Sequence, residues 1–496
     1  MRDISIIGSG FSSISAACYL ASKGHKVDVY EKNDQLGGRA RQFIIDGFKF
    51  DIGPTWYWMP DVFERFFADF GKKPSDYYDL TKLSPAYRVY FGENEFVDID
   101  DSIDKIAKTF EEIEPGSSKE LLKFLKSAKN NYDIAIKDLV YKPGLSPVEL
   151  VTKETVRHLD QFYFTIHDYV KKHFKDPRLQ QILEFPVLFL GAKPSNTPLF
   201  YSFMNYADFG LGTWYPKGGM RSVVAAMISL AKELGVQFHT NSNVSAINID
   251  SSNAVESLTI NNERIAVDIL ISGADYRHTE TLLPLKGRAY SEKYWSKKTM
   301  APSSLLFFVG FSKKLKNVLH HTLFFDTSFD DHAKEIYDHP AWPKKPLFYA
   351  SFPSISETEL APPDKEAGIF LIPLAPDLED SEAMREKYFD IIMTRLEKLT
   401  GQSIKDSILF KNSYCVQDFK DDYNSYKGNA YGMANTLTQT AFLRPKIKSS
   451  KIDKLYFTGQ LTVPGPGVPP SLISGKIVSD QISKKTTKLS EHEVTI

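Results

Sequence analysis

The chain has 496 residues, 42% of them hydrophobic and 25% charged, which is the composition of a globular protein with room for two or more domains. Its formal net charge of −1 provides no electrostatic reason to expect nucleic acid as a partner. Two cysteines, Cys18 and Cys415, are too few for a disulfide framework and favour a reducing, cytoplasmic location.

Hydropathy along the chain predicts no segment that crosses a bilayer, because no run of about 18 apolar residues occurs. The first apolar stretch is interrupted by glycines and serines, so it does not match the unbroken apolar core of a signal peptide. Neither observation excludes a protein that lies on a membrane surface.

The first 31 residues predict the opening unit of a parallel α/β sheet. Residues 4–7 are a short buried strand ending at Gly8, residues 14–21 have apolar side chains at helical spacing, and residues 27–30 form a second strand. Strand, glycine turn, helix and strand in this order are typical of a Rossmann-like nucleotide-binding domain.

The turn in this unit has the residues of a pyrophosphate site. Gly8 allows a tight turn, Gly10 lets a pyrophosphate approach the backbone, and Phe11 and Ser12 open a helix whose N–H groups face the anion. Ser13 replaces the third glycine of the dinucleotide pattern. That position serves packing of helix on strand, so a small serine is expected to be tolerated.

Glu31 ends the second strand, about 20 residues after the glycine turn. An acidic side chain at this place is expected to bind the two ribose hydroxyls, and it would repel a 2′-phosphate. The alternative is a purely structural turn without a ligand, and the position of Glu31 argues against it.

The segment that follows resembles a large family of FAD-dependent enzymes. Gly37, Gly38 and Arg39 match the second glycine motif of this family. The resemblance implies a backbone that passes close to the cofactor and an arginine near the flavin pyrophosphate. Gly53 and Pro54 match the family's next element, in which an aspartate precedes the glycine by two residues.

Two pieces in the middle of the chain extend the resemblance. Residues 214–220 match a P-x-G-G element that opens a helix, and residues 241–249 resemble the strand whose backbone at Val244 is implied to contact adenine. Residues 263–275 predict a single strand that ends at a glycine turn.

The C-terminal segment, residues 455–475, resembles the flavin-closing signature of the bacterial-type phytoene desaturases, which belong to the carotenoid and retinoid oxidoreductases. The resemblance implies that Gly459, Gly467 and Val468 contact FAD. Many members have a histidine where this chain has Val463, which removes one titratable candidate from beside the flavin.

The resemblance implies an α/β fold in which a Rossmann-like FAD-binding domain is interleaved with an α+β substrate-binding domain that has a helical, membrane-facing part. We place the FAD-binding domain at residues 1–80, 214–300 and 405–496. The substrate-binding domain then takes residues 81–213 and 301–404.

The activity implied by the resemblance is FAD-dependent desaturation of a C40 carotenoid precursor, with phytoene to lycopene as the expected conversion in carotenoid biosynthesis. Flavin accepts a hydride and the neighbouring carbon loses a proton, so the protein needs mainly apolar side chains around an extended polyene. Two aromatic-rich segments, residues 55–70 and 184–210, are candidates for that lining, although core packing explains any single aromatic equally well. Quinone and oxygen are both open as the electron acceptor.

No residue is identified from the sequence as the proton acceptor, so no catalytic side chain is predicted. His278, His320 and His321 lack metal-ligand spacing and are expected to be surface or core residues, and no metal site is predicted. Asp421 and Asp422 are expected to be a solvated loop pair.

Two apolar helix faces predict peripheral association with a membrane. They lie at residues 62–70 and 162–174, and a lysine pair, at 72–73 and at 171–172, accompanies each face. The alternative for each face is a helix that packs on the core with a solvated end.

Three other functions stay open. A desaturase of a later, hydroxylated carotenoid would share every flavin motif. A flavin-free isoprenoid-binding chaperone, similar to the Rab GDP-dissociation inhibitors, would lack an intact flavin site. A flavin amine oxidase would share the early motifs, but the C-terminal signature fits desaturases better.

Overall fold

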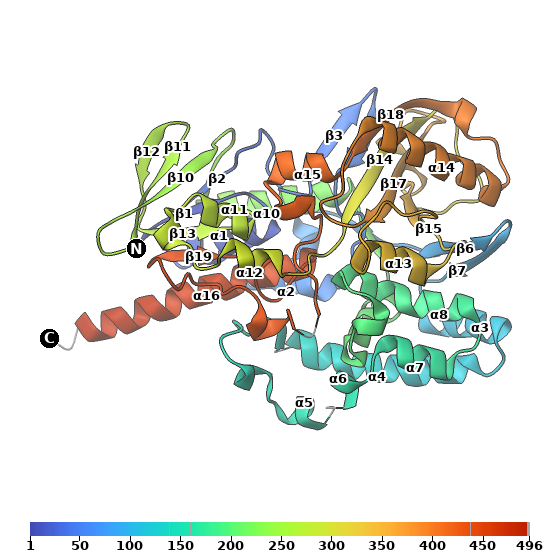
Figure 1. The fold of residues 1–496 in the computed structure, drawn as a ribbon, viewed down its shortest axis with the longest axis horizontal. Helices are drawn as coiled ribbons and strands as arrows, with labels where there is room; N and C mark the ends of the chain where they lie inside the picture. Colours follow the sequence, from blue (N-terminus) through green and yellow to red (C-terminus); the bar gives the residue numbers. More distant parts are fainter. Residues whose placement is uncertain (138, 158–159, 437, 494–496) are drawn as a thin grey trace.

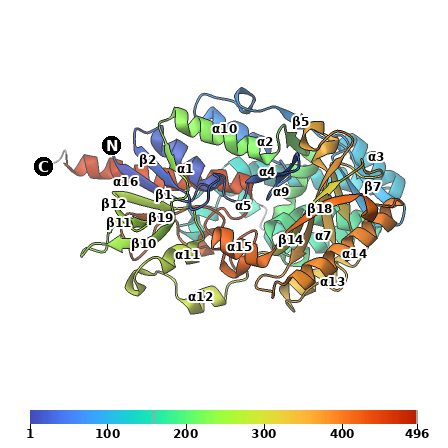
Figure 2. The ribbon, with the colours of Figure 1, turned by 90° about the horizontal axis from the view of Figure 1, so that it is seen from above.

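The computed structural model describes residues 1–137, 139–157, 160–436 and 438–493. Two units lie side by side, each built around its own sheet, with a layer of helices beneath one of them (Figure 1). Helix α15 lies between the two units in both views (Figures 1 and 2).

The first unit contains a parallel sheet of five short strands assembled from three distant parts of the chain. All four pairings in it are parallel. A three-stranded antiparallel sheet packs beside it. In spatial order the parallel sheet is β19 (Leu455–Phe457), β13 (Ile269–Ser272), β1 (Asp3–Ile7), β2 (Lys26–Tyr30) and β9 (Gln237–His239), and the smaller sheet is β10 (Val244–Ile249), β11 (Val255–Ile260) and β12 (Glu263–Ala266).

The second unit contains a mixed sheet of seven strands, antiparallel except where β15 pairs with β6. Two further antiparallel pairs lie outside these sheets, the hairpin of β3 with β4 and the pair of β5 with β8, whose strands are far apart in sequence. In spatial order the sheet is β18 (Ile408–Tyr414), β14 (Ser303–Phe311), β17 (Glu366–Leu374), β16 (Phe348–Ser351), β15 (His321–Phe324), β6 (Tyr87–Gly92) and β7 (Glu95–Ile99), and the pairs are β3 (Gln42–Ile45), β4 (Phe48–Asp51), β5 (Leu80–Lys82) and β8 (Trp214–Pro216).

Helices cover both units, and a group of them forms the lower right of the molecule in Figure 1. The first unit has α1 (Phe11–Ala21), α10 (Met220–Glu233), α11 (Tyr276–Thr281), α12 (Glu292–Ser296) and α16 (Val468–Glu493). The helical group has α2 (Pro60–Ala68), α3 (Ile103–Ile113), α4 (Ser117–Lys137), α5 (Lys153–Arg157), α6 (Asp160–Tyr163), α7 (Ile166–His173), α8 (Pro177–Glu184) and α9 (Phe203–Asn205), and the second sheet is covered by α13 (Phe329–Tyr337), α14 (Glu382–Thr400) and α15 (Val416–Tyr423).

The predicted opening unit is confirmed as β1, α1 and β2, with the helix starting three residues earlier than its apolar spacing suggested. The prediction of one strand over residues 263–275 is wrong. The structure divides it into β12 and β13, because the chain leaves the antiparallel sheet after Ala266 and enters the parallel sheet at Ile269.

The domain boundaries stay a prediction. The strand composition of the sheets is relevant to one of them, the boundary at residue 405. Strand β18 pairs with β14 along Leu306–Phe311, so residues 408–414 lie in the seven-stranded sheet although residues 405–496 were assigned to the FAD-binding domain. The parallel sheet itself takes all its strands from residues 3–30, 237–272 and 455–457.

The two apolar faces predicted to lie on a membrane face the interior instead. Val62, Phe63, Phe66 and Phe67 on α2 are all buried, and Phe66 packs edge-on against Tyr19 of α1. On the second face, the side chains of Ile166, Val170 and Phe174 are fully buried. These faces are buried because other helices cover them, α1 and α16 in the case of α2, and α3 beside Phe174. Sequence periodicity cannot distinguish such cover from cover by lipid.

Within the described part of the chain, no helix is both long and apolar enough to span a membrane.

Candidate functional site

One cavity of about 630 Å³ runs from the parallel sheet into the second unit. Its first end, the nucleotide end, is lined by the β1–α1 turn, the loop that holds Gly37, Gly38 and Arg39, and the residues before α16. Its other end, which we call the apolar arm, is lined mainly by large apolar side chains: Trp56, Trp58, Phe185, Leu188, Phe200, Phe203, Met204, Leu323, Phe325, Phe348 and Leu371. All fourteen residues predicted to bind the cofactor line this cavity.

The β1–α1 turn presents the N-terminus of α1 to the cavity. Gly8 has φ = 84°, a backbone conformation that favours glycine. Gly10 is the N-cap of α1 without a side-chain hydrogen bond, and a Cβ built on it would meet nothing within 4 Å. The first turn of α1 has no acidic residue. Free N–H groups and open space at this place fit a pyrophosphate.

Glu31 is buried at the end of β2, and its carboxylate braces the surrounding loops. Its Oε2 accepts hydrogen bonds from Ser9 N at 3.0 Å and Ser9 Oγ at 2.7 Å, and its Oε1 accepts from Asn33 N and Nδ2, both at 3.0 Å. The side chain also lines the nucleotide end. Its predicted contact with ribose stays a prediction, and the structure adds a second role in fixing the turn.

Close backbone approach explains two of the predicted glycines. A Cβ on Gly38 would lie 3.0 Å from Gly10 Cα, and a Cβ on Gly53 would lie 1.9 Å from the carbonyl oxygen of Arg39. Only glycine therefore lets these loops stack against each other around the nucleotide end.

Arg39 is a half-buried cation, and the described residues form no ion pair with it. Its Nη2 donates to Ser425 Oγ at 3.3 Å and to the Asn429 carbonyl at 3.5 Å, and the Gln460 amide oxygen can accept from Nη1 and Nη2 at 3.2 and 3.0 Å. Its Nε has no hydrogen-bond partner among the described atoms. Burial has the largest effect and lowers the pKa of Arg39. Tyr423 and, to a smaller extent, Asp275 act in the opposite direction and raise it. A guanidinium of this kind fits an anionic ligand such as the FAD pyrophosphate.

Asp422 belongs to helix α15 and lines the nucleotide end, so the prediction of a solvated loop pair at Asp421 and Asp422 is wrong. Asp422 pairs with Arg41 and accepts a hydrogen bond from Tyr414 OH at 2.9 Å. Asp421 is exposed on the same helix. Helix α15 begins just after a turn at Cys415. In this turn the Asp418 carboxylate accepts a hydrogen bond from the Cys415 N–H at 2.8 Å.

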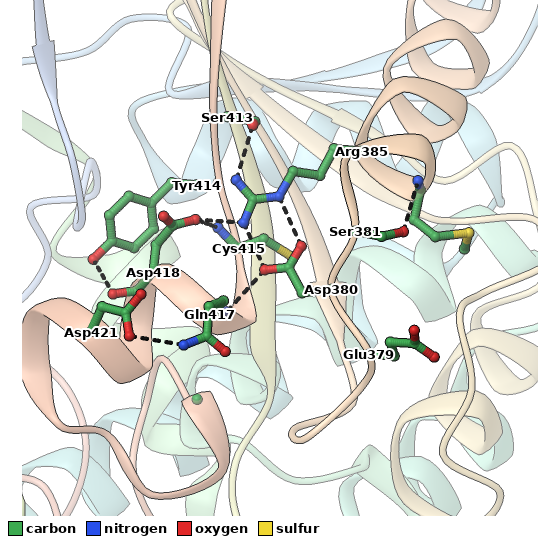
Figure 3. A network of polar contacts seen from close by, with 12 residues as sticks. Glu379, Asp380, Ser381, Arg385, Ser413, Tyr414, Cys415, Gln417, Asp418 and Asp421 are labelled. Atoms are coloured by element: carbon green, nitrogen blue, oxygen red, sulfur yellow. Dashed lines mark hydrogen bonds and ion pairs between the residues drawn. The ribbon is translucent and has the colours of Figure 1, made fainter.

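Arg385 fastens α15 to the second unit, as Figure 3 shows. It forms two hydrogen bonds with Asp380, at 2.8 and 2.6 Å, and it reaches Asp418 at 2.7 Å and Ser413 Oγ at 3.2 Å. Asp380 also accepts from the Gln417 N–H at 2.9 Å. Because α15 holds Asp422 and Tyr423 at the cavity wall, this network positions the wall from outside.

The C-terminal segment closes the nucleotide end as the resemblance implied, since Gly459, Gly467 and Val468 all line the cavity. Gly475 was not predicted, although it makes the tightest contact in this region. A Cβ on it would lie 2.5 Å from Ser12 O and 2.6 Å from Ala16 N, so α16 crosses α1 in direct backbone contact. A glycine inside an apolar helical pattern was the available signal.

Ser13 does not line the cavity. Its side chain is fully buried, and its Oγ would lie 2.0 Å from a Cβ on Gly273, at the end of β13. The position therefore serves packing of α1 on the sheet.

The three histidines bind no metal that the structure reveals, because no group of three metal-ligating side chains occurs among the described residues. His320 and His321 are buried as core residues, and His278 lines the nucleotide end. Burial lowers the pKa of His278 to about 4, with Lys32 and Arg277 adding to the shift. Cys18 is fully buried in α1.

Comparison with known proteins agrees with this site. The family model of flavin-containing amine oxidoreductases matches residues 12–483. A protein of Haloarcula japonica named carotenoid 3,4-desaturase is 40% identical over 486 residues, which are 97% of this chain and 98% of that protein. A zeta-carotene-forming phytoene desaturase of Myxococcus xanthus is 30% identical over 97% of this chain and 94% of its own length.

A solved structure has the same fold. An oxidoreductase from Methanosarcina mazei superposes with a TM-score of 0.64 at 16% identity, covering 96% of this chain and 100% of that one. With a dinucleotide turn, a guanidinium that forms no ion pair among the described residues and a family match over nearly its whole length, the chain belongs to the flavin-containing amine oxidoreductases, and its cofactor is FAD.

Proposed function

We propose that this protein desaturates a carotenoid, with FAD as the hydride acceptor. The observation that supports this best is the single cavity in which the nucleotide end opens into the apolar arm. An extended hydrocarbon can lie in the arm with its reacting carbons toward the cofactor. The two carotenoid desaturases among the relatives support the same substrate class.

The chemistry that FAD supplies when bound is acceptance of a hydride from a carbon of the substrate. The chain's own residues hold the cofactor and exclude water. Arg39 and the α1 N-terminus would hold the pyrophosphate, and Trp56, Phe185 and Leu323, which line the arm, would surround the hydrocarbon. Apolar walls of this kind position a substrate that offers no hydrogen bonds.

The sequence predicts the conversion of phytoene to lycopene, and a later carotenoid is the alternative. The relative at 40% identity is named a 3,4-desaturase, whereas the phytoene desaturase is 30% identical, and this difference favours the later carotenoid. Purified protein loaded with FAD should be incubated with phytoene and, separately, with a hydroxylated carotenoid that is saturated at carbons 3 and 4. Turnover of the second alone supports 3,4-desaturation, and turnover of phytoene supports the other conversion.

Two measurements separate this proposal from its rivals. Purified protein that stays colourless after FAD is added, with no flavin absorbance, would favour an isoprenoid-binding chaperone. Oxidation of amines with release of peroxide would favour an amine oxidase. The same preparation can be reduced under anaerobic conditions and then mixed with quinone or, separately, with oxygen, and the faster reoxidation identifies the electron acceptor.

We propose that the protein docks on a membrane through the segment around α5 and α6 rather than through the faces predicted from the sequence. Six apolar side chains of this segment are 52–84% exposed: Leu145, Val148, Val151, Val156, Tyr163 and Phe164. They alternate along the chain with Gly144, Ser146, Leu150, Thr155 and Phe162, which line the cavity. The arm therefore reaches the surface where apolar side chains gather, as entry from a lipid phase requires.

Liposome flotation tests this surface. The double variant Val148→Asp, Val151→Asp should lose liposome binding and keep its FAD. Ile44→Asp is the matched control, because Ile44 is 62% exposed on β3, at the opposite edge of the molecule in Figure 1. Equal binding by the double variant, or none by the wild type, would contradict the proposal.

A further inference from the structure

A hydrogen-bonded cluster lies on the wall of the apolar arm, apart from the FAD motifs. The hydroxyl of Tyr349 on β16 lies 2.7 Å from His321 Nδ1 and 2.8 Å from Thr55 Oγ1. Thr55 and Tyr349 line the cavity, and His321 lies behind them on β15 with no exposed surface. Two segments far apart in sequence, residues 55–56 and the β15–β16 pair, are joined here.

The His321 ring is stacked on the indole of Trp56, with 4.0 Å between ring centroids and 10° between the ring planes. Trp56 also lines the cavity. Stacking on an indole face favours a positive charge on the imidazole, because the face of the ring attracts cations. The cluster therefore joins a hydroxyl at the cavity wall to a ring whose protonated form has a stabilising neighbour.

The imidazole is neutral in the resting protein. Burial holds the pKa of His321 well below its usual value, and His320 adds to this effect. The Nε2 atom has no hydrogen-bond partner among the described side chains. With the ring hydrogen on Nε2, Nδ1 accepts the hydrogen bond from Tyr349, and Thr55 donates to the Tyr349 oxygen.

We propose that Tyr349 is the proton acceptor of the desaturation and that His321 is the positioning residue that takes the phenolic proton in turn. This inference rests on the proposed function, because it assigns the fate of the proton that every desaturation must release. It also explains the polar cluster, which an arm built only to hold a hydrocarbon does not need.

The step balances as follows. One substrate carbon has given its hydride to the cofactor, so the C–H bond of the neighbouring carbon breaks and its electron pair forms the C=C bond. That proton bonds to the Tyr349 oxygen while the original phenolic O–H bond breaks and its proton bonds to His321 Nδ1. Tyr349 stays neutral, and His321 becomes an imidazolium stacked on Trp56. A weak base is sufficient, because a carbon beside a carbocation is a strong acid.

The experiment compares three single variants and the Tyr349→Phe, His321→Gln double variant in anaerobic single turnover, and in steady state for KM, with the carotenoid that the wild type converts, unlabelled and deuterated at the carbon that loses the proton. Tyr349→Phe removes the hydroxyl and His321→Gln removes the imidazole. Tyr388→Phe is the matched control: its hydroxyl is buried on α14, donates to the Pro343 carbonyl at 2.6 Å, and lies outside the cavity lining. FAD content and melting temperature are measured for every variant.

We expect Tyr349→Phe to slow product formation about 100-fold, with KM changed less than threefold and FAD content unchanged. The deuterium effect at the proton-losing carbon should increase, since that step becomes limiting. His321→Gln should slow the reaction at least tenfold, and the double variant should lose no more than Tyr349→Phe alone, because the two residues act as a unit. Tyr388→Phe should behave like the wild type.

An unchanged rate and isotope effect in Tyr349→Phe would overturn the assignment while the proposed function stands. A wild-type protein that binds FAD and converts no carotenoid would overturn the proposed function and the assignment with it. A rate loss matched by loss of FAD or of melting temperature in both variants, without a larger isotope effect, would show that the cluster is structural and would also overturn the assignment.

Discussion

The two ends of the cavity are built in different ways. The nucleotide end is formed largely by backbone at glycines in short local motifs, and Glu31, Arg39 and Asp422 are among its charged side chains. The apolar arm is formed by side chains of the residues just before α2, of the segment that leads into and includes α9, and of the seven-stranded sheet. These parts of the chain meet only in the folded protein. A site made of backbone is sensitive to any added side chain, whereas a site made of apolar side chains can be reshaped.

The largest effect is expected at Gly10 of the nucleotide end. Gly10 has φ = −71°, which valine can adopt, and a Cβ there would point into open space. Gly10→Val should therefore fill the cofactor's place without straining the backbone, and FAD affinity should fall at least 100-fold in a titration followed by flavin fluorescence. Ser13→Gly is the control and should change the affinity less than threefold. Equal losses would show that Ser13 contacts the cofactor.

The next effect is expected at the network that fastens α15. Burial alone would raise the pKa of Asp380, but hydrogen bonds from Arg385 and the Gln417 N–H hold it below its usual value. Arg385→Met leaves this carboxylate unpaired and should cost about 2–4 kcal/mol in urea unfolding. Arg264→Met, in an exposed ion pair with Glu256, should cost less than about 0.5 kcal/mol. A small loss from Arg385→Met would mean that α15 is held by its apolar contacts.

The stabilising effect of the Asp380–Arg385 pair has a defined pH dependence. The folded-state pKa of Asp380 is lowered, so the stabilisation from the pair is fully present above the unfolded pKa near 3.9. This stabilisation is lost as the pH falls through the lower pKa of the folded state. The difference in stability between wild type and Arg385→Met should therefore narrow in acid.

A smaller effect is expected in the apolar arm. Phe203 lines the arm and Phe209 is buried nearby in sequence without lining it. Each Phe→Leu change should cost about 1–1.5 kcal/mol of stability and leave FAD binding unchanged. Only Phe203→Leu should alter the preference among carotenoids of different length or end group, read from product ratios. The same change in product ratio in both variants would show that substrate preference is not set by the side chains that line the arm.

The smallest effect is expected at Asp208, beneath the arm. The Asp208 carboxylate accepts hydrogen bonds from Tyr87 OH at 2.7 Å and from the Thr213 hydroxyl. The Thr213 hydroxyl in turn accepts a hydrogen bond from the Trp58 indole N–H at 2.8 Å. Burial raises the pKa of Asp208 to about 7, so the folded protein keeps a proton that the unfolded chain releases between about pH 4 and 7. Stability from this group is therefore present at low pH and lost as the pH rises to 7.

Asp208→Asn removes that dependence and keeps the shape of the side chain. The variant should melt a few degrees higher than the wild type at pH 8 and about equally at pH 4, below the unfolded pKa of the carboxyl, measured by calorimetry. Asp51, whose pKa burial also raises to about 7, contributes the same slope in both proteins. Asp104→Asn, on the exposed face of α3, serves as the control. A variant less stable than the wild type at pH 8 would show that ionised Asp208 is well solvated by its hydrogen bonds.

Sequence patterns alone determined the β1–α1–β2 unit, the fourteen residues of the nucleotide end and the small packing position at Ser13. They could do so because a dinucleotide contacts backbone, and backbone contact requires glycines at fixed spacings within one short segment.

Only the tertiary structure decided which apolar faces are covered, which aromatic side chains line the arm, and where Tyr349, His321 and Trp56 meet. Periodicity states that a helix face is apolar but not what covers it, so the faces on α2 and α7 were wrongly assigned to a membrane while the exposed segment around α5 was overlooked. A hydroxyl and an imidazole 28 residues apart become a pair through strand register, since β15 and β16 lie side by side in the sheet. Burial and long-range pairing depend on the whole chain, and no short segment contains them.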